Sequence, residues 1–127
     1  MKVLVMDGVT EEGLTPLRKE KNIEVVIGKP MNEEELVSTI GGFDALIVRS
    51  ATKVTENVLN AGDRLKIVGR AGVGVDNIDI EAATRRGVLV VNAPDGNTIA
   101  ATEHAIAMML ALARNIPQAA AKMREGI

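Results

Sequence analysis

The chain lacks cysteine, tryptophan and tyrosine, and Phe43 is its only aromatic residue. Without cysteine it has neither disulfides nor thiolate chemistry, which fits a reducing cytoplasm. Without aromatic side chains it has no platform on which nucleic-acid bases or a flavin ring could stack. Its core must therefore be built from Val, Ile, Leu, Met and Ala, which the hydrophobic content of 46% can supply in one domain of 127 residues.

Basic runs and long apolar runs are also missing. The 15 Lys and Arg against 17 Asp and Glu give a net charge of −2, which does not favour nucleic acid or anionic lipid as a partner. The apolar start turns polar at Asp7, too soon for a signal peptide. No stretch reaches the roughly 18 apolar residues of a membrane span. We predict a cytoplasmic protein with no nucleic-acid and no membrane partner.

Short runs rich in Val and Ile alternate with amphipathic segments. The predicted strands are Lys2–Met6, Ile23–Ile27, Ala45–Val48, Lys66–Gly69 and Val88–Val91, and their composition is typical of strands buried on both faces. The predicted helices are Glu11–Glu20, Asn32–Ile40, Thr55–Ala61 and Asp79–Arg86. This alternation predicts an α/β fold, a flavodoxin-like doubly wound parallel sheet of five strands in the order 2-1-3-4-5.

Polar residues and glycines mark the helix ends. Four residues are placed to cap helix N-termini: Thr10, Asn32, Thr55 and Asp79. Asn32 with Glu35 also has the spacing of a capping box. Three glycines follow helices, where we expect left-handed backbone: Gly41, Gly62 and Gly87.

The segment Ile99–Ala113 is apolar almost all round, with 12 apolar residues in 15. A helix of this kind needs cover on several sides. Either it folds back on the sheet, or two chains share it in a dimer; the former is the preferred expectation. Beyond it, residues 118–126 predict a final amphipathic turn or two.

Ligands of such sheets bind at the carboxyl ends of the strands. One of these ends carries Gly69, Gly72 and Gly74 just before a helix, where backbone amides can hold an anion. The order G-x-x-G-x-G is not the dinucleotide fingerprint G-x-G-x-x-G. The alternative is a tight strand–helix turn with no ligand.

Arg49, Ser50 and Thr52 follow another predicted strand, and a guanidinium with hydroxyls suits a carboxylate or phosphate. A surface Arg beside a capping Ser is the alternative. Asn97–Thr98 precedes the apolar helix and fits an N-cap as well as a ligand contact.

Catalytic and metal sites are not predicted. His104, the only histidine, has no nucleophile at a useful spacing and is assigned a structural role. Asp7 is similar to the phosphoacceptor of a receiver domain, but Arg49–Ser50 stands where that chemistry needs an acidic pocket. A receiver-like or flavin-binding module is therefore disfavoured, and the sequence shows no metal-ligand spacing.

The motifs together resemble a known family. They are residues 49–54 (RSATKV), 68–77 (VGRAGVGVDN), 81–84 (EAAT), 92–98 (NAPDGNT) and 101–104 (ATEH). In this order they resemble the N-terminal part of the NAD-dependent D-2-hydroxyacid dehydrogenases, and most of all the members that oxidise 3-phosphoglycerate in serine synthesis.

The resemblance implies roles for individual residues. Substrate-binding residues would be Arg49, Ser50, Ala51, Thr52, Gly72, Val73, Gly74 and Asn97. Cofactor-binding residues would be Val73 and Thr98. Relatives often carry Thr where this chain has Val73, so a hydroxyl contact with the cofactor would be lost. The substrate would be a small anionic 2-hydroxy acid.

The resemblance also implies a division of the chain. Residues 1–98 would form the substrate-binding domain, and 99–127 would lead to a Rossmann domain that the sequence does not contain. The catalytic Arg, Glu and His of the family are missing with it. We therefore expect a truncated domain that is inactive alone, binds its anion weakly and binds no NAD, although full-length relatives use NAD. A homodimer through 99–113 is a further expectation. The alternative function is a flavodoxin-like fragment for folding or design, with no ligand.

Overall fold

A computed structural model describes residues 1–126 of the chain and divides it into two compact units. The first unit is Met1–Gly96, and the second begins at Asn97.

The first unit is built on a five-stranded parallel sheet in the order β2-β1-β3-β4-β5, which confirms the predicted fold. The strands are β1 (Lys2–Val5), β2 (Glu24–Ile27), β3 (Ala45–Val48), β4 (Ile67–Arg70) and β5 (Leu89–Asn92). All five predicted strands are present, with ends within one residue of the prediction. In β4 and β5 the register runs one residue further, so Arg70 and Asn92 are sheet residues.

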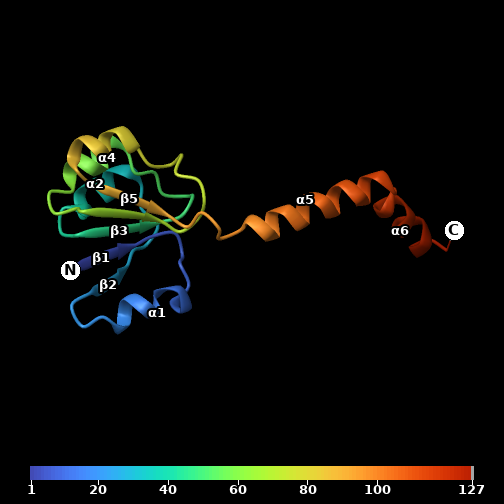
Figure 1. Cartoon of the computed structure of the whole chain (residues 1–127), viewed down its shortest axis with the longest axis horizontal. Helices are drawn as coiled ribbons and strands as arrows, with labels where there is room; N and C mark the ends of the chain where they lie inside the picture. The colour runs from blue at the N-terminus through green and yellow to red at the C-terminus, as the bar shows by residue number, and fades with distance from the viewer. Residues whose placement is uncertain (127) are drawn as a thin grey trace. The chain divides into compact units, whose positions relative to one another are not determined.

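Helices cover both faces of this sheet. They are α1 (Glu11–Lys19), α2 (Glu33–Ile40), α3 (Glu56–Ala61) and α4 (Ile80–Arg86). Figure 1 shows α1 on one face of the sheet and α2 and α4 on the other. Two hydrophobic clusters match these layers. The larger includes Leu36 of α2, Leu59 of α3 and Leu46 of β3, and the smaller joins Leu14 of α1 to Val3 and Val5 of β1.

The outer strands correct one expectation. Burial on both faces holds for the central strands, but Ile27 in β2 and Leu89 and Val91 in β5 are 48%, 58% and 42% exposed. Both strands lie at edges of the sheet, and their residues have sheet neighbours on one side only. Residue composition did not distinguish the edge strands from the central ones.

The helix starts follow the prediction closely. The side chains of Thr10, Asn32, Thr55 and Asp79 each accept a hydrogen bond from an amide of the first turn. The capping box is confirmed, because the Glu35 carboxylate accepts from the Asn32 amide at 2.8 Å. Each of these helices after α1 therefore begins one residue later than predicted, with the cap outside it.

The helix ends were predicted less well. Gly87 has the expected left-handed backbone, with φ of +67°. The prediction was wrong for Gly41, which is right-handed with φ of −57°, and for Gly62, with φ of −85°. Helix α3 closes instead with the Gly62 amide donating to the Leu59 carbonyl. A glycine after a helix permits the left-handed turn but does not impose it.

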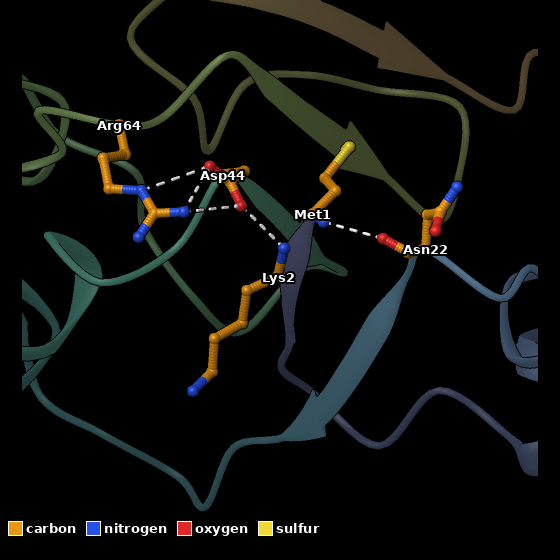
Figure 2. Close-up of polar contacts among 5 residues, drawn as sticks. All are labelled: Met1, Lys2, Asn22, Asp44 and Arg64. Carbon is orange, nitrogen blue, oxygen red and sulfur yellow. Dashed lines mark hydrogen bonds and ion pairs between the residues drawn. The ribbon is translucent and has the colours of Figure 1, made fainter.

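The amino edge of the sheet is tied together by Asp44, which precedes β3 (Figure 2). Its carboxylate accepts from the Lys2 amide at 2.7 Å and pairs with the Arg64 guanidinium at 2.9 Å. The Lys2 amide first and the Arg64 side chain second hold the pKa of Asp44 below its ordinary value. The N-terminal amine donates to the Asn22 carbonyl at 2.7 Å. These contacts link β1, β2, β3 and the segment before β4.

The second unit contains α5 (Thr98–Ala113) and α6 (Ile116–Arg124). None of their residues is buried. Helix α5 confirms the predicted apolar helix, starting one residue earlier. The tail forms a helix longer than the one or two turns predicted, beginning two residues earlier at Ile116 with Pro117 in its first turn, where proline is favoured.

Candidate functional site

The candidate site lies at the carboxyl edge of the sheet. Val48, Arg70 and Asn92 are in register across β3, β4 and β5, so the loops that follow these strands start side by side. The Ala71 amide donates to the Val48 carbonyl at 2.8 Å, and the Ala93 amide donates to the Gly72 carbonyl at 2.9 Å. The structure thus brings the Arg49 loop and the glycine turn together, as the sequence predicted.

The loop Arg49–Thr52 is held by side chains from two other segments. Asp7, just after β1, accepts hydrogen bonds from the Arg49 amide at 2.8 Å and the Thr52 amide at 3.0 Å. The Thr52 hydroxyl donates to the other Asp7 oxygen at 2.6 Å. Asn77 acts on the loop carbonyls, donating through Nδ2 to Arg49 and Thr52 at 2.7 Å each. The backbone of the loop is therefore fixed at both its amides and its carbonyls.

Asp7 has an unusual backbone for this task. Its φ of +61° is in the left-handed region, which asparagine and aspartate tolerate better than most residues. Partial burial raises the pKa of the Asp7 carboxyl, but hydrogen bonds from the Thr52 hydroxyl and from the loop amides outweigh it and lower the pKa below its ordinary value. Asp7 is thus a carboxylate engaged by neighbouring donors, which disfavours the phosphoacceptor alternative further.

The glycine turn offers amides to a ligand. The Gly72 amide donates to the Arg70 carbonyl at 2.8 Å, while within residues 1–126 the amides of Val73 and Gly74 have no acceptor. Asn92 fixes the turn by donating to the Val73 carbonyl at 2.6 Å. Val73 itself is 39% exposed. Two unpaired amides on a fixed turn are suited to a carboxylate.

Two guanidinium groups stand at the same edge. Neither Arg49 nor Arg70 forms an ion pair with a carboxylate anywhere in the described residues. Arg49 is exposed, and the Nε of Arg70 is buried without a hydrogen-bond partner in the part of the chain that the structure describes. A Cβ added to Gly72 would overlap the Arg70 guanidinium, so glycine at this position leaves room for that side chain.

The predicted residues of the second unit are placed on α5. Asn97 occupies the N-cap position but makes no side-chain capping bond, so its amide is available for other contacts. Thr98 begins the helix, and His104 lies on its exposed surface. The roles of Asn97 and Thr98 in binding stay predictions, as do those of the other site residues.

Besides Asp7, three residues of this edge were not predicted as site residues: Arg70, Asn77 and Asn92. Each belongs to a quoted motif, and Arg70 and Asn92 are the last residues of their strands. A register one residue longer would have placed both at the carboxyl edge. No comparable signal marks Asn77, because its partners lie 25 and 28 residues away in the sequence.

Other features of the described residues suit an anion less well. A hollow of about 810 Å³ is lined by Glu33 and Glu34 of α2 together with Asn57 and Asn60 of α3. The Thr55 hydroxyl first, and then Asn57, lower the pKa of Glu33. The walls of this hollow are therefore negatively charged at neutral pH. Within residues 1–126 no group of three or more potential ligand residues could hold a metal ion, and no helix is long and apolar enough to cross a membrane.

Comparison with known proteins identifies the family. The profile described as "D-isomer specific 2-hydroxyacid dehydrogenase, catalytic domain" matches residues 3–127. The chain therefore belongs to the D-isomer specific 2-hydroxyacid dehydrogenases, which confirms the resemblance.

Curated relatives include the D-3-phosphoglycerate dehydrogenases of Synechocystis and Archaeoglobus fulgidus. The first is 53% identical over 98% of this chain and 22% of the relative, and the second is 55% identical over 99% and 24%. The chain thus spans about a quarter of the length of these relatives.

Solved structures agree with this. The NAD⁺-bound 3-phosphoglycerate dehydrogenase of Entamoeba histolytica is 35% identical, with a TM-score of 0.76 over 87% of this chain and 38% of that one. A protein of Thermus thermophilus is 32% identical, with a TM-score of 0.84 over 99% and 41%. Both are similar to this chain over less than half of their own length.

Proposed function

We propose that this chain is the substrate-binding domain of an NAD-dependent oxidoreductase that acts on 3-phosphoglycerate. The observation that carries the proposal is the carboxyl edge of the sheet. There the free guanidinium of Arg49 and the unpaired amides of Val73 and Gly74 stand on two adjoining, fixed loops. The high identity to phosphoglycerate dehydrogenases supports this substrate over other 2-hydroxy acids.

The two groups have complementary tasks in binding. Arg49, with Ser50 and the backbone of Ala51 and Thr52, holds one charged end of the substrate, because a guanidinium forms paired hydrogen bonds with carboxylate or phosphate. The glycine turn from Gly72 to Gly74 receives the carboxylate. Asn97 is assigned a further polar contact with substrate, and Thr98 and Val73 are assigned contacts with the cofactor of a full-length enzyme.

The residues of this chain do not make a dinucleotide site. NAD is the hydride acceptor when it is bound. The glycine turn of this chain, however, has the wrong spacing to hold the pyrophosphate of NAD, and the Gly72 amide already donates to the Arg70 carbonyl. The carboxylate at this edge, Asp7, is engaged with the loop and is not assigned as a general base, and His104 is assigned a structural role. We therefore propose that this chain binds substrate and does not catalyse turnover alone.

Titration of the purified chain with 3-phosphoglycerate, followed by amide NMR, tests binding. We expect a dissociation constant of about 1 mM, equivalent to ~4 kcal/mol, with shifts at residues 49–52 and 72–74. Arg49→Gln should weaken binding at least tenfold. Arg124→Gln, which removes the same charge from exposed α6, should not. Absence of any shift would refute the proposal and favour the alternative of a flavodoxin-like chain without a ligand.

Turnover has its own assay. The chain mixed with 3-phosphoglycerate and NAD should produce no NADH above background. Measurable production that scales with chain concentration would contradict the proposed inactivity while leaving the binding role intact.

We also propose that two copies of the chain associate through residues 99–113. Six large apolar side chains of α5 are between 48% and 76% exposed: Ile99, Ile106, Met108, Met109, Leu110 and Leu112. Single exposed apolar residues are normal on a protein surface, but six on one helix form a larger apolar surface. A symmetric dimer would bury this surface on both chains.

A further inference from the structure

The proposed binding role leaves Asp7 and Asn77 unexplained. Both direct their hydrogen bonds to the same loop, yet neither belongs to the proposed binding groups. Asp7 adopts a left-handed backbone to do so. Asn77 leaves its Oδ1 buried without a partner in the described residues, although buried polar atoms are almost always paired. Two locally unfavourable features thus converge on residues 49–52.

We propose that Asp7 and Asn77 are positioning residues that set the backbone of Arg49–Thr52 for anion binding. This inference rests on the proposed function. Asp7 receives the loop amides and Asn77 supplies donors to the loop carbonyls, so the loop is held between them from two sides. Neither residue touches the substrate in this proposal.

We call Asp7 and Asn77 together the clamp, and the need for it follows from the loop itself. Arg49 and Ser50 are exposed, and among residues 49–52 only Thr52 is buried. An exposed loop without ordered secondary structure loses conformational entropy when it binds a ligand. A loop that is already fixed by hydrogen bonds loses less. The clamp therefore raises affinity without a contact of its own.

Because Asp7 is negatively charged, the positioning role predicts a change in anion affinity of a distinctive sign when that charge is removed. A carboxylate beside an anion-binding loop repels an anion, so electrostatics alone predicts tighter binding in Asp7→Asn. Positioning predicts the opposite. Asparagine keeps the size of the side chain and can turn its single oxygen toward the two loop amides, but that oxygen is neutral and accepts more weakly, and its Nδ2 cannot accept from the Thr52 hydroxyl. Weaker anion binding after loss of a negative charge is a result that positioning explains and charge removal does not.

The experiment compares the whole 127-residue chain with Asp7→Asn and Asn77→Ala at pH 7. Amide hydrogen exchange at Arg49 and Thr52 reports loop order without a ligand, and NMR titrations with 3-phosphoglycerate and inorganic phosphate report affinity. Hydrogen bonds to charged groups shift equilibria by about tenfold or more. We expect both amides to exchange at least tenfold faster in Asp7→Asn, and both variants to bind 3-phosphoglycerate about tenfold more weakly. The phosphate titration shows whether the loop holds the phosphate or the carboxylate end.

Two matched controls keep the result specific. Asp63→Asn makes the same charge change at a site 88% exposed, and Asn60→Ala removes an exposed amide from α3. Neither should alter exchange or affinity. Thermal unfolding of every variant identifies any variant that fails to fold. If Asp7→Asn does not fold, the exchange and affinity of Asn77→Ala test the positioning role.

The outcomes separate the two proposals. Unchanged exchange at Arg49 and Thr52 in both variants overturns the positioning role, as does tighter anion binding by Asp7→Asn. If the unaltered chain binds neither anion, the proposed function fails and with it the link to affinity, while faster exchange would still show that the clamp orders the loop.

Discussion

Helix α5 allows a sharp test of the proposed dimer, by the double substitution Met109→Lys and Leu112→Lys. These residues are three apart and so share a face of the helix. They are 63% and 76% exposed, and neither belongs to a hydrophobic cluster of the first unit. The substitution therefore removes apolar surface from α5 without touching the core of the sheet.

The magnitude follows from the exposed fractions. Full burial of a Leu or Met side chain stabilises by about 1.5–3 kcal/mol, so burying the exposed part of each is worth about 1–2 kcal/mol. Two side chains on each of two chains give about 4–8 kcal/mol for the dimer. At about 1.4 kcal/mol for each factor of ten, the dissociation constant should rise by at least several hundredfold.

Sedimentation or light scattering over a range of concentrations measures this change. We expect a dimer for the unaltered chain and a monomer for the double variant, with the unfolding free energy of the sheet unit changed by less than about 0.5 kcal/mol. Thr102→Lys, which adds one lysine at a polar position of α5, is the control and should disturb association less. A monomeric unaltered chain refutes the dimer. If the double variant of such a monomeric chain is also less stable, the expectation preferred from the sequence, in which the helix folds back on the sheet of its own chain, gains support.

Further predictions concern the sheet unit. Leu46→Ala should lower the unfolding free energy by about 2–5 kcal/mol in chemical denaturation, because Leu46 is fully buried in the larger cluster; a loss below 1 kcal/mol would contradict that packing. Gly87→Ala should cost about 1–2 kcal/mol, since alanine is strained at φ of +67°, whereas Gly13→Ala should stabilise α1 by about 0.5–1 kcal/mol, because its new methyl meets only ordinary contacts. Folding lowers the pKa values of Asp7 and Asp44, so their contribution is fully present above the unfolded value of about 3.9 and is lost as the pH falls through the lower folded values. Melting temperatures measured from pH 6 to pH 2 should therefore fall below about pH 4, and less steeply in Asp44→Asn; an equally steep fall in that variant would count against Asp44.

The position of the candidate binding groups could be predicted from the sequence because these groups follow directly on strands. Arg49 and the glycine turn come immediately after apolar runs, and parallel strands place such positions at one edge. The clamp could not be predicted from the sequence, because its contacts join residues that are far apart along the chain. Asp7 and Thr52 are 45 residues apart, and nothing local requires their contact.

The sequence by itself determined the strand order, the four capped helix starts and the apolar character of α5, because each follows from periodicity or from residues within one turn of one another. Only the tertiary structure decided which strands lie at the edges, which glycines turn left-handed, and that Asp7 and Asn77 hold the Arg49 loop from two sides. The sheet edges and the contacts of Asp7 and Asn77 depend on residues far apart in the sequence that folding brings together, and such contacts leave no periodic pattern in the sequence. A glycine after a helix permits the left-handed turn without imposing it.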